Sequence, residues 1–256
     1  MNFGLNLYSI RNLIQTEEDF LNTAFKLKEM GYSYLQYSGG QYNAEMIKSV
    51  VEKTGLPIVL THVPFDRIVN DTNALIEEHR SFGCKNIGLG AMPVDTIIDE
   101  KLCLDAIDKL NKAGKVMAEK GFKFFYHHHH YEFIKHSEIT VFDYMVENAP
   151  YINFTLDTYW LQYAGKDILS VLDKLKGRYS CVHLKDYMIQ LNREDKTFNP
   201  VFAPIGDGQI DFKAVIAKMK ENGVEYFLVE QDNASVLPDS LKQVEKSIKY
   251  LTENFL

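Results

Sequence analysis

The sequence predicts an α/β protein, a single (β/α)₈ barrel that covers residues 1–256. Short β-rich runs alternate with longer amphipathic stretches, and this unit repeats eight times. The repeats average about 32 residues, in a chain of the length common for such barrels. A doubly wound open sheet would show the same alternation. However, about five to seven strands are usual there, and no glycine-rich phosphate loop follows the first run.

The predicted strands are, in chain order, Phe3–Tyr8, Ser33–Tyr37, Pro57–His62, Asn86–Gly90, Phe122–His127, Ile152–Asp157, Ser180–Leu184 and Glu225–Glu230. The helical stretches between them have apolar residues three and four positions apart, and they include Glu17–Met30, Ala44–Thr54, Asp66–Phe82, Glu100–Lys120 and Leu237–Asn254. Several end in glycine, which can adopt the left-handed conformation that closes a helix. The one long irregular piece is Tyr187–Gln209, and we expect it to be a mobile loop that closes over the site.

The composition is that of an average globular protein, with 46% hydrophobic and 25% charged residues. The net charge of −7 disfavours a protein whose main work is to hold nucleic acid. No apolar run approaches the ~20 residues that span a bilayer, the N-terminus does not resemble a signal peptide, and three scattered cysteines make no disulfide framework. We therefore expect a cytoplasmic protein that acts on a small molecule, without nucleic acid or membrane as partner. A homo-oligomer remains open.

In such a barrel the working residues lie at the C-terminal ends of the strands. Polar residues gather at five of the predicted ends, namely Thr61-His62, Tyr126–Glu132, Leu156-Asp157, His183–Asp186 and Glu230–Asp232. Buried polar groups cost free energy unless they have partners, so this set is not expected from packing alone. Carboxylates and imidazoles that converge at one barrel mouth match a site for a divalent metal ion.

Each residue also has a structural interpretation. Asp157 suits the N-cap of the following helix, and a lone His62 suits a core or turn position. Because side chains alternate along a strand, His127 and His129 share one face, and His128 and His130 share the other.

Lys185 can reach a substrate oxygen or pair with a carboxylate, and Trp160 can form a wall against a sugar ring or pack on its loop. A thiol mechanism through Cys181 and His183 is a weaker alternative. The glycines of Gly206–Asp211 are explained by a turn, with Asp211 capping the next helix.

Several of these segments resemble the sugar phosphate isomerase/epimerase family, whose barrel is of the xylose isomerase type. The strongest match is Tyr126–Phe133, which is similar to that family's Tyr-His-Asn-His-x-x-Glu-Phe segment. The other matches follow in the family's order and cover essentially the whole chain: Gly4–Arg11, Thr61–Phe65, Leu156–Trp160, Val182–Asp186, Gly206–Asp211 and Val229–Asp232. His128 stands where the common pattern has Asn, which is similar to the inosose dehydratase branch.

The resemblance implies one divalent metal ion, such as Mn²⁺, Mg²⁺, Zn²⁺ or Co²⁺, with Glu132, Asp157, His183 and Glu230 as ligands. Many relatives place the first glutamate on the strand itself, where this chain has Tyr126, so His127 or His129 is the alternative fourth ligand. The residues that we expect to bind substrate are His62, Tyr8, Lys185 and Trp160.

The implied activity is isomerisation or epimerisation of a small carbohydrate, by proton abstraction next to a metal-bound carbonyl. Glu132 and Glu230 are the expected pair for proton exchange, with His127 and His129 as further catalytic residues. A lyase or dehydratase acting on a keto-sugar, keto-glycoside or cyclitol is the alternative at the same site. A sugar-binding barrel without turnover and an endonuclease are less favoured. No cluster of Arg and Lys marks a phosphate pocket, which favours an unphosphorylated substrate.

Overall fold

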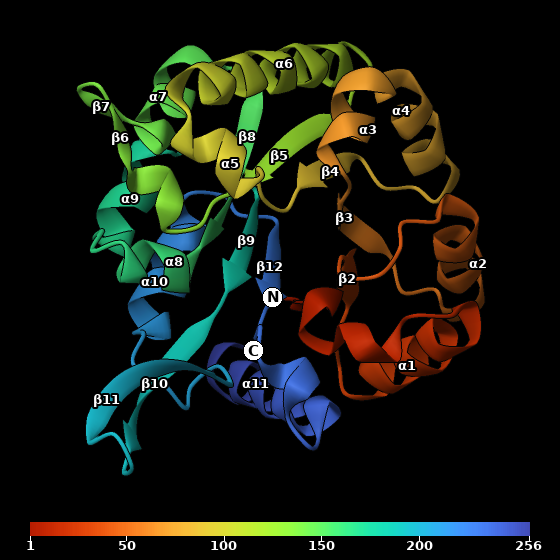
Figure 1. Ribbon diagram of the computed structural model, residues 1–256. Helices are drawn as coiled ribbons and strands as arrows, with labels where there is room; N and C mark the ends of the chain where they lie inside the picture. Colours follow the sequence, from red (N-terminus) through yellow and green to blue (C-terminus); the bar gives the residue numbers. More distant parts are fainter.

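A computed structural model describes residues 1–256 and shows the closed barrel that the sequence predicts (Figure 1). Its parallel strands are, in spatial order, β1 (Gly4–Asn6), β12 (Tyr226–Val229), β9 (Cys181–Leu184), β8 (Ile152–Asp157), β5 (Lys123–His127), β4 (Asn86–Leu89), β3 (Ile58–His62) and β2 (Tyr34–Tyr37), which pairs again with β1. Each predicted run contains one of these strands. The eightfold alternation therefore gave the correct fold.

The helices surround the barrel (Figure 1). They are α1 (Glu17–Glu29), α2 (Ala44–Thr54), α3 (Phe65–Asn70), α4 (Thr72–Ser81), α5 (Val94–Ile98), α6 (Glu100–Glu119), α7 (Val141–Asn148), α8 (Thr158–Tyr163), α9 (Ile168–Lys174), α10 (Phe212–Glu221) and α11 (Ser240–Phe255). The predicted helix Asp66–Phe82 is two helices, because Asp71 leaves helical geometry at φ −121° and ψ 28°. Asp and Asn compete for local backbone groups and favour such breaks. No helix has both the length and the apolar character needed to cross a membrane.

The interior of the barrel is filled in layers. A lower layer of buried side chains is mostly apolar and contains Tyr34, Leu60, Phe125, Cys181 and Leu228. Because side chains alternate across a strand, the residue two positions further along each strand also points inward, one layer closer to the C-terminal ends. These residues are Gln36, His62, His127, His183 and Glu230. The upper layer of the same lumen is therefore polar.

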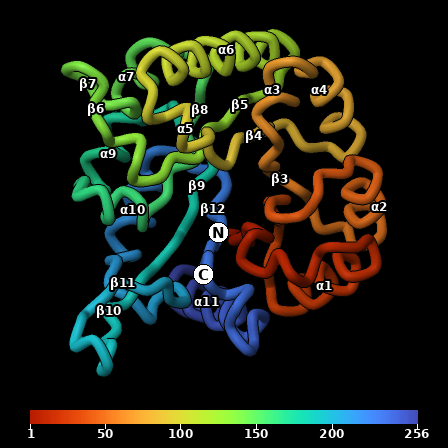
Figure 2. Tube along the Cα trace, in the orientation of Figure 1, coloured from red at the N-terminus to blue at the C-terminus, as the bar shows by residue number.

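The segment that we expected to be an irregular mobile loop is a β-hairpin over most of its length. Strands β10 (Asp186–Asn192) and β11 (Thr197–Ala203) pair in antiparallel register from Asp186–Ala203 to Asn192–Thr197. The hairpin projects away from the barrel (Figures 1 and 2). The prediction of an irregular segment was wrong because the hairpin is largely exposed, so no buried face imposes the alternation of apolar and polar residues that marks a half-buried strand. A smaller hairpin, β6 (Lys135–His136) and β7 (Ile139–Thr140), precedes α7.

Asp186 anchors the base of the long hairpin. Its buried carboxylate accepts hydrogen bonds from five backbone N–H groups, those of Tyr187, Gly206, Gly208, Gln209 and Ile210. A Cβ at Gly208 would clash with this carboxylate, which explains the second glycine of the motif. Asp211 accepts from the N–H groups of Lys213 and Ala214, as expected for the cap of α10.

Asp186→Ala should lower the free energy of unfolding by about 2–4 kcal/mol, because buried N–H donors lose their charged acceptor. Chemical denaturation measures the effect. The matched control is Asp195→Ala at the exposed tip of the same hairpin, where a change within about 0.5 kcal/mol is expected. Equal stability of the two variants would show that the carboxylate does not hold this turn.

Candidate metal centre and cavity

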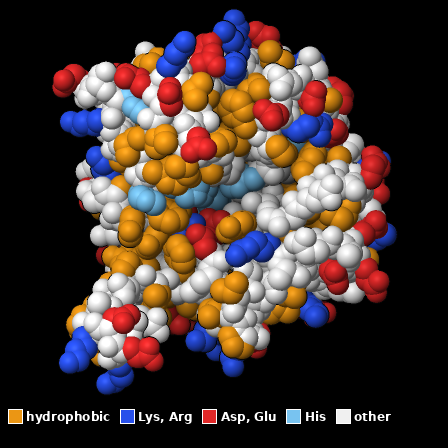
Figure 3. Space-filling view, viewed as in Figure 1, with side chains coloured by type: hydrophobic (Ala, Val, Ile, Leu, Met, Phe, Trp, Pro, Cys, Tyr) orange, Lys and Arg blue, Asp and Glu red, His pale blue; other side chains and the backbone are white.

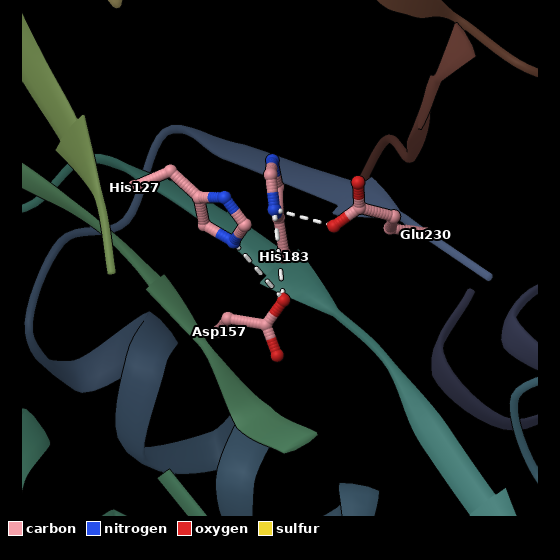
Figure 4. Close-up of side chains that lie close together, drawn as sticks. All are labelled: His127, Asp157, His183 and Glu230. Atoms are coloured by element: carbon pink, nitrogen blue, oxygen red, sulfur yellow. Dashed lines mark hydrogen bonds and ion pairs between the residues drawn. The ribbon is translucent and has the colours of Figure 1, made fainter. Parts of the chain in front are cut away.

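Four buried side chains meet at the C-terminal end of the barrel: His127, Asp157, His183 and Glu230 (Figure 4). They come from the ends of β5, β8 and β9 and from the residue after β12. Each offers one ligand atom, and these atoms all lie within 4.8 Å of one another. His127 Nε2 lies 3.3 Å from Asp157 Oδ2, and His183 Nδ1 lies 2.8 Å from Glu230 Oε2.

Asp157 combines the two roles that its sequence position suggested as alternatives. Its Oδ1 accepts the backbone N–H of Trp160 at 3.1 Å and caps α8. Its Oδ2 faces the cluster, where it lies 3.7 Å from His183 Nδ1. The helix cap therefore fixes the orientation of the carboxylate toward the other three side chains.

The hydrogen bonds of His183 show that the cluster needs a positive charge. His183 Nε2 donates to Gln36 Oε1 at 2.7 Å, so the second nitrogen, Nδ1, faces the carboxylates and lies 2.8 Å from Glu230 Oε2. Burial opposes a charge on this ring, but the carboxylates of Glu230 and Asp157 outweigh it and raise the pKa of His183 to about 9. A proton or a metal cation must therefore occupy Nδ1. Two imidazoles and two carboxylates are a donor set that divalent metals accept, so the cluster can hold such an ion.

Lys185 adds a permanent charge beside the cluster. Its Nζ lies 3.0 Å from Asp157 Oδ2, 2.8 Å from Glu230 Oε2 and 3.0 Å from Asp232 Oδ1. Although burial alone would lower the pKa of Lys185, the three carboxylates raise it well above its ordinary value. Burial would raise the pKa values of Asp157 and Glu230, yet Lys185 and the neighbouring histidines hold both well below the usual range. All three groups are therefore charged.

A cavity of about 250 Å³ opens above the cluster. Its lining is mostly polar and consists of Tyr8, Ser38, Gly39, His62, Gly90, Ala91, His127, His129, Lys185, Glu230 and Asp232. Figure 3 shows histidine side chains gathered in the hollowed centre of this face, with acidic atoms beside them. Four of these lining residues, Glu230, Lys185, His62 and Tyr8, were expected to bind metal or substrate, and His127 and His129 were expected as alternative metal ligands.

The four consecutive histidines separate as strand alternation predicts. His127 and His129 line the cavity, whereas His128 accepts the backbone N–H of Asp157 and His130 stacks on Trp160. His129 Nδ1 is hydrogen-bonded to the Tyr131 hydroxyl at 3.0 Å, and the ring's other nitrogen, Nε2, is not used in this bond. Burial lowers the pKa of His129, so this nitrogen belongs to a neutral ring.

Two residues expected to bind substrate lie differently. Trp160 does not line the cavity. Its ring lies 5.3 Å from Lys185 Nζ and 5.2 Å from the ring of His129, so it packs behind them. Tyr8 does line the cavity, but from a 3₁₀ helix, Leu7–Leu13, rather than from the predicted strand. The Arg11 guanidinium covers the Tyr8 ring at 4.2 Å.

The structure does not bring Glu132 into the cluster. Its buried carboxylate accepts the Tyr126 hydroxyl and the His129 backbone N–H, both at 2.7 Å. Tyr126 alternates with His127 and points away from the lumen, and the 3₁₀ turn Tyr131–Phe133 carries Glu132 to the same side. His127 stands in the cluster instead. Burial without a cation raises the pKa of Glu132 to about 7.

Sequence reasoning missed two amides that support the site. Gln36 joins His183 to His62, and Asn6 Nδ2 donates to Glu230 Oε1 at 2.7 Å. Both sit at inward positions near strand ends, and both are fully buried. Their inward positions could have indicated a supporting role, because a buried amide requires hydrogen-bond partners.

A family model described as a xylose isomerase-like TIM barrel matches residues 25–254. The chain belongs to the xylose isomerase-like TIM barrel family. One relative of similar sequence is the inosose dehydratase of Clostridium perfringens (strain 13 / Type A). It is 29% identical, over 90% of this chain and 85% of that protein.

Solved structures of the xylose isomerase-like type share the fold. A sugar phosphate isomerase/epimerase from Parabacteroides distasonis superposes with a TM-score of 0.80 at 21% identity, covering 99% of this chain and 94% of that one. A xylose isomerase-like TIM barrel protein from Mycobacterium smegmatis, solved in complex with magnesium, gives 0.71 at 14% identity, covering 98% and 95%. At these identities the likeness shows the fold alone.

The environment of Glu132 predicts a pH effect on stability. Its pKa is raised from 4.5 to about 7 in the folded state. Protonated Glu132 therefore makes its full contribution to the free energy of unfolding below pH 4.5, and this contribution is lost as the pH rises through 7. Between pH 5 and 8 this loss amounts to about 2–3 kcal/mol.

Glu132→Gln should remove that part of the pH dependence, because a neutral amide can bond both Tyr126 and the His129 N–H. Chemical denaturation at pH 5 and pH 8 measures it. Exposed Glu147→Gln is the control and should keep the wild-type dependence. Parallel curves for Glu132→Gln and the wild type would contradict this account.

Proposed function

We propose that the protein is a divalent-metal-dependent dehydratase of an uncharged polyol ketone, such as a keto-sugar or keto-cyclitol. The observation that carries the proposal is the buried cluster of His127, Asp157, His183 and Glu230 at the floor of a polar cavity. The named relative, an inosose dehydratase, supports the reaction type. Isomerisation or epimerisation of a small carbohydrate is the second candidate, since it begins with the same proton abstraction.

A divalent cation at the cluster would supply Lewis acidity, which polarises a ketone oxygen and acidifies the neighbouring C–H bond. His129 is the candidate base for that proton, because it lines the cavity and its Nδ1 is bonded to the Tyr131 hydroxyl, which leaves Nε2 for the substrate. The imidazolium formed in this way can return the proton to the β-hydroxyl, so that water leaves and a C=C bond forms. One histidine thus balances the elimination.

Lys185 orients the substrate rather than moving the proton. Its ammonium lines the cavity, and its raised pKa makes it a weak acid that stays charged. Its three N–H donors face three carboxylates, so it can donate to a substrate oxygen when one pairing is released, such as that with the partly exposed Asp232. Cys181, the nucleophile of the weaker alternative, lies a layer below, and burial raises its thiol pKa well above the ordinary value. It carries no thiolate for nucleophilic attack.

The position of Glu132 favours dehydration over the two-glutamate exchange that we expected for an isomerase. That exchange needs carboxylates on both sides of the substrate, and Glu132 is sealed between Tyr126 and the His129 backbone. Glu230 has both oxygens engaged, by Asn6 and by the His183–Lys185 side. A single acid–base residue is sufficient for elimination, so His129 meets the requirement.

Binding of Mn²⁺ or Zn²⁺ should release about one proton near pH 7.5, because His183 must give up the Nδ1 proton that its pKa of about 9 retains. Calorimetric titration in buffers of different ionisation enthalpy measures the count. Glu132→Gln should bind the ion like the wild type, whereas Asp157→Asn/Glu230→Gln should contain none by elemental analysis. Wild-type metal content in that double variant would remove the cluster from the proposal.

His129→Gln should lower kcat by about 10²–10⁴-fold on an accepted polyol ketone, the usual contribution of general acid–base catalysis. Mass spectrometry of a panel of keto-sugars and keto-cyclitols follows the loss of water. Reactions in D₂O report exchange at the α-carbon. The adjacent His130→Gln is the matched control, since His130 lies outside the cavity lining, and it should retain activity. Deuterium incorporation with no loss of water would favour the isomerase candidate.

A further inference from the structure

One buried amide in the barrel lumen contacts two histidines, one on the neighbouring strand β3 and one on β9, which is not adjacent to β2. Gln36 on β2 is fully buried. Its Oε1 accepts the Nε2–H of His183 on β9 at 2.7 Å, and its Nε2 donates to the Nε2 of His62 on β3 at 2.9 Å. His183 belongs to the cluster, and His62 lines the cavity.

These two bonds dictate where each imidazole carries its proton. An amide oxygen only accepts and an amide nitrogen only donates. His183 must therefore be protonated at Nε2, which leaves Nδ1 for a cation. His62 must have a lone pair at Nε2 and a proton at Nδ1, and Nδ1 indeed lies 3.2 Å from Ser38 Oγ. The reverse orientation of the amide would place the proton on His183 Nδ1 and block that nitrogen.

The room around His62 supports a fixed ring. A Cβ at Gly90 would lie 2.9 Å from His62 Nδ1, and one at Gly88 would lie 3.2 Å from His62 Cδ2. The ring also stacks on His127 at 5.6 Å. With both nitrogens hydrogen-bonded, His62 presents its ring to the cavity and offers no free nitrogen to a substrate.

We propose that Gln36 is a positioning residue that sets the tautomers of His183 and His62, and so keeps His183 Nδ1 available for the metal ion. The inference rests on the proposed metal site. Partners of this kind fix the orientation and basicity of a ligating histidine, and their loss typically weakens metal binding by about 10–100-fold.

Two substitutions of similar size separate the two bonds. Gln36→Met removes both and should weaken Zn²⁺ binding by about 10–100-fold in a calorimetric titration. Gln36→Glu offers acceptors only, so it should keep Zn²⁺ affinity within about threefold of the wild type while reversing the tautomer of His62. Ser38→Ala is the control, because it removes the other partner of His62 and leaves the His183–Gln36 bond intact.

The tautomer of His62 is read from ¹⁵N chemical shifts of the metal-free protein, so this measurement does not depend on the proposed function. The expected result is protonation at Nδ1 in the wild type and Ser38→Ala, and at Nε2 in Gln36→Glu. The proposal is overturned if Gln36→Glu leaves the tautomer unchanged, or if a folded Gln36→Met binds Zn²⁺ as tightly as the wild type. If thermal unfolding shows that Gln36→Met does not fold, the tautomer in Gln36→Glu decides alone. A wild type that takes up no metal would instead refute the proposed function.

Discussion

The burial of two carboxylates, Asp157 and Glu230, at the end of the barrel is the constraint on which the site depends. An ionised carboxylate taken out of water costs several kcal/mol unless charges and donors surround it. The chain surrounds Glu230 with Lys185, His183 and the Asn6 amide, and it gives Asp157 the N-terminus of α8. Loss of one partner would leave a charge buried without compensation, so the elements that supply these groups are held in one arrangement.

Strand alternation explains why these groups converge. In a closed parallel barrel, every second residue of each strand points into the same lumen. Phe125, Cys181 and Leu228 fill the lower layer with largely apolar side chains, and the residues two positions later are His127, His183 and Glu230. A dry floor lowers the effective dielectric beneath the polar layer and strengthens the interactions there. The same alternation of side chains along each strand thus packs the barrel interior and assembles the site.

The fold was predictable from the sequence because all eight strands carry strong local signals. Asp157, His183 and Glu230 were predictable because strand alternation and the barrel mouth determine their direction. Glu132 was not, because it follows the strand by five residues, and a 3₁₀ turn decides which side it takes. The long hairpin was not predicted because its structure depends on the pairing of β10 with β11, which neither segment indicates alone. The role of Gln36 depends on a contact 147 residues away in the sequence, which no local pattern contains.

The charges of the cavity bear on the kind of substrate it accepts. Asp157, Glu230 and Asp232 bring three negative charges, and Lys185 together with protonated His183 brings two positive ones. A divalent cation that replaces the His183 proton would make the total zero. Arginine is missing from the lining, and no cationic group is left without a carboxylate partner. The site would then have no net positive charge to attract a phosphorylated or carboxylated ligand, whereas an uncharged polyol could hydrogen-bond to the same groups. With the proposed metal ion in place, the charge balance would therefore favour an uncharged polyol over an anionic sugar, which agrees with the proposed substrate class.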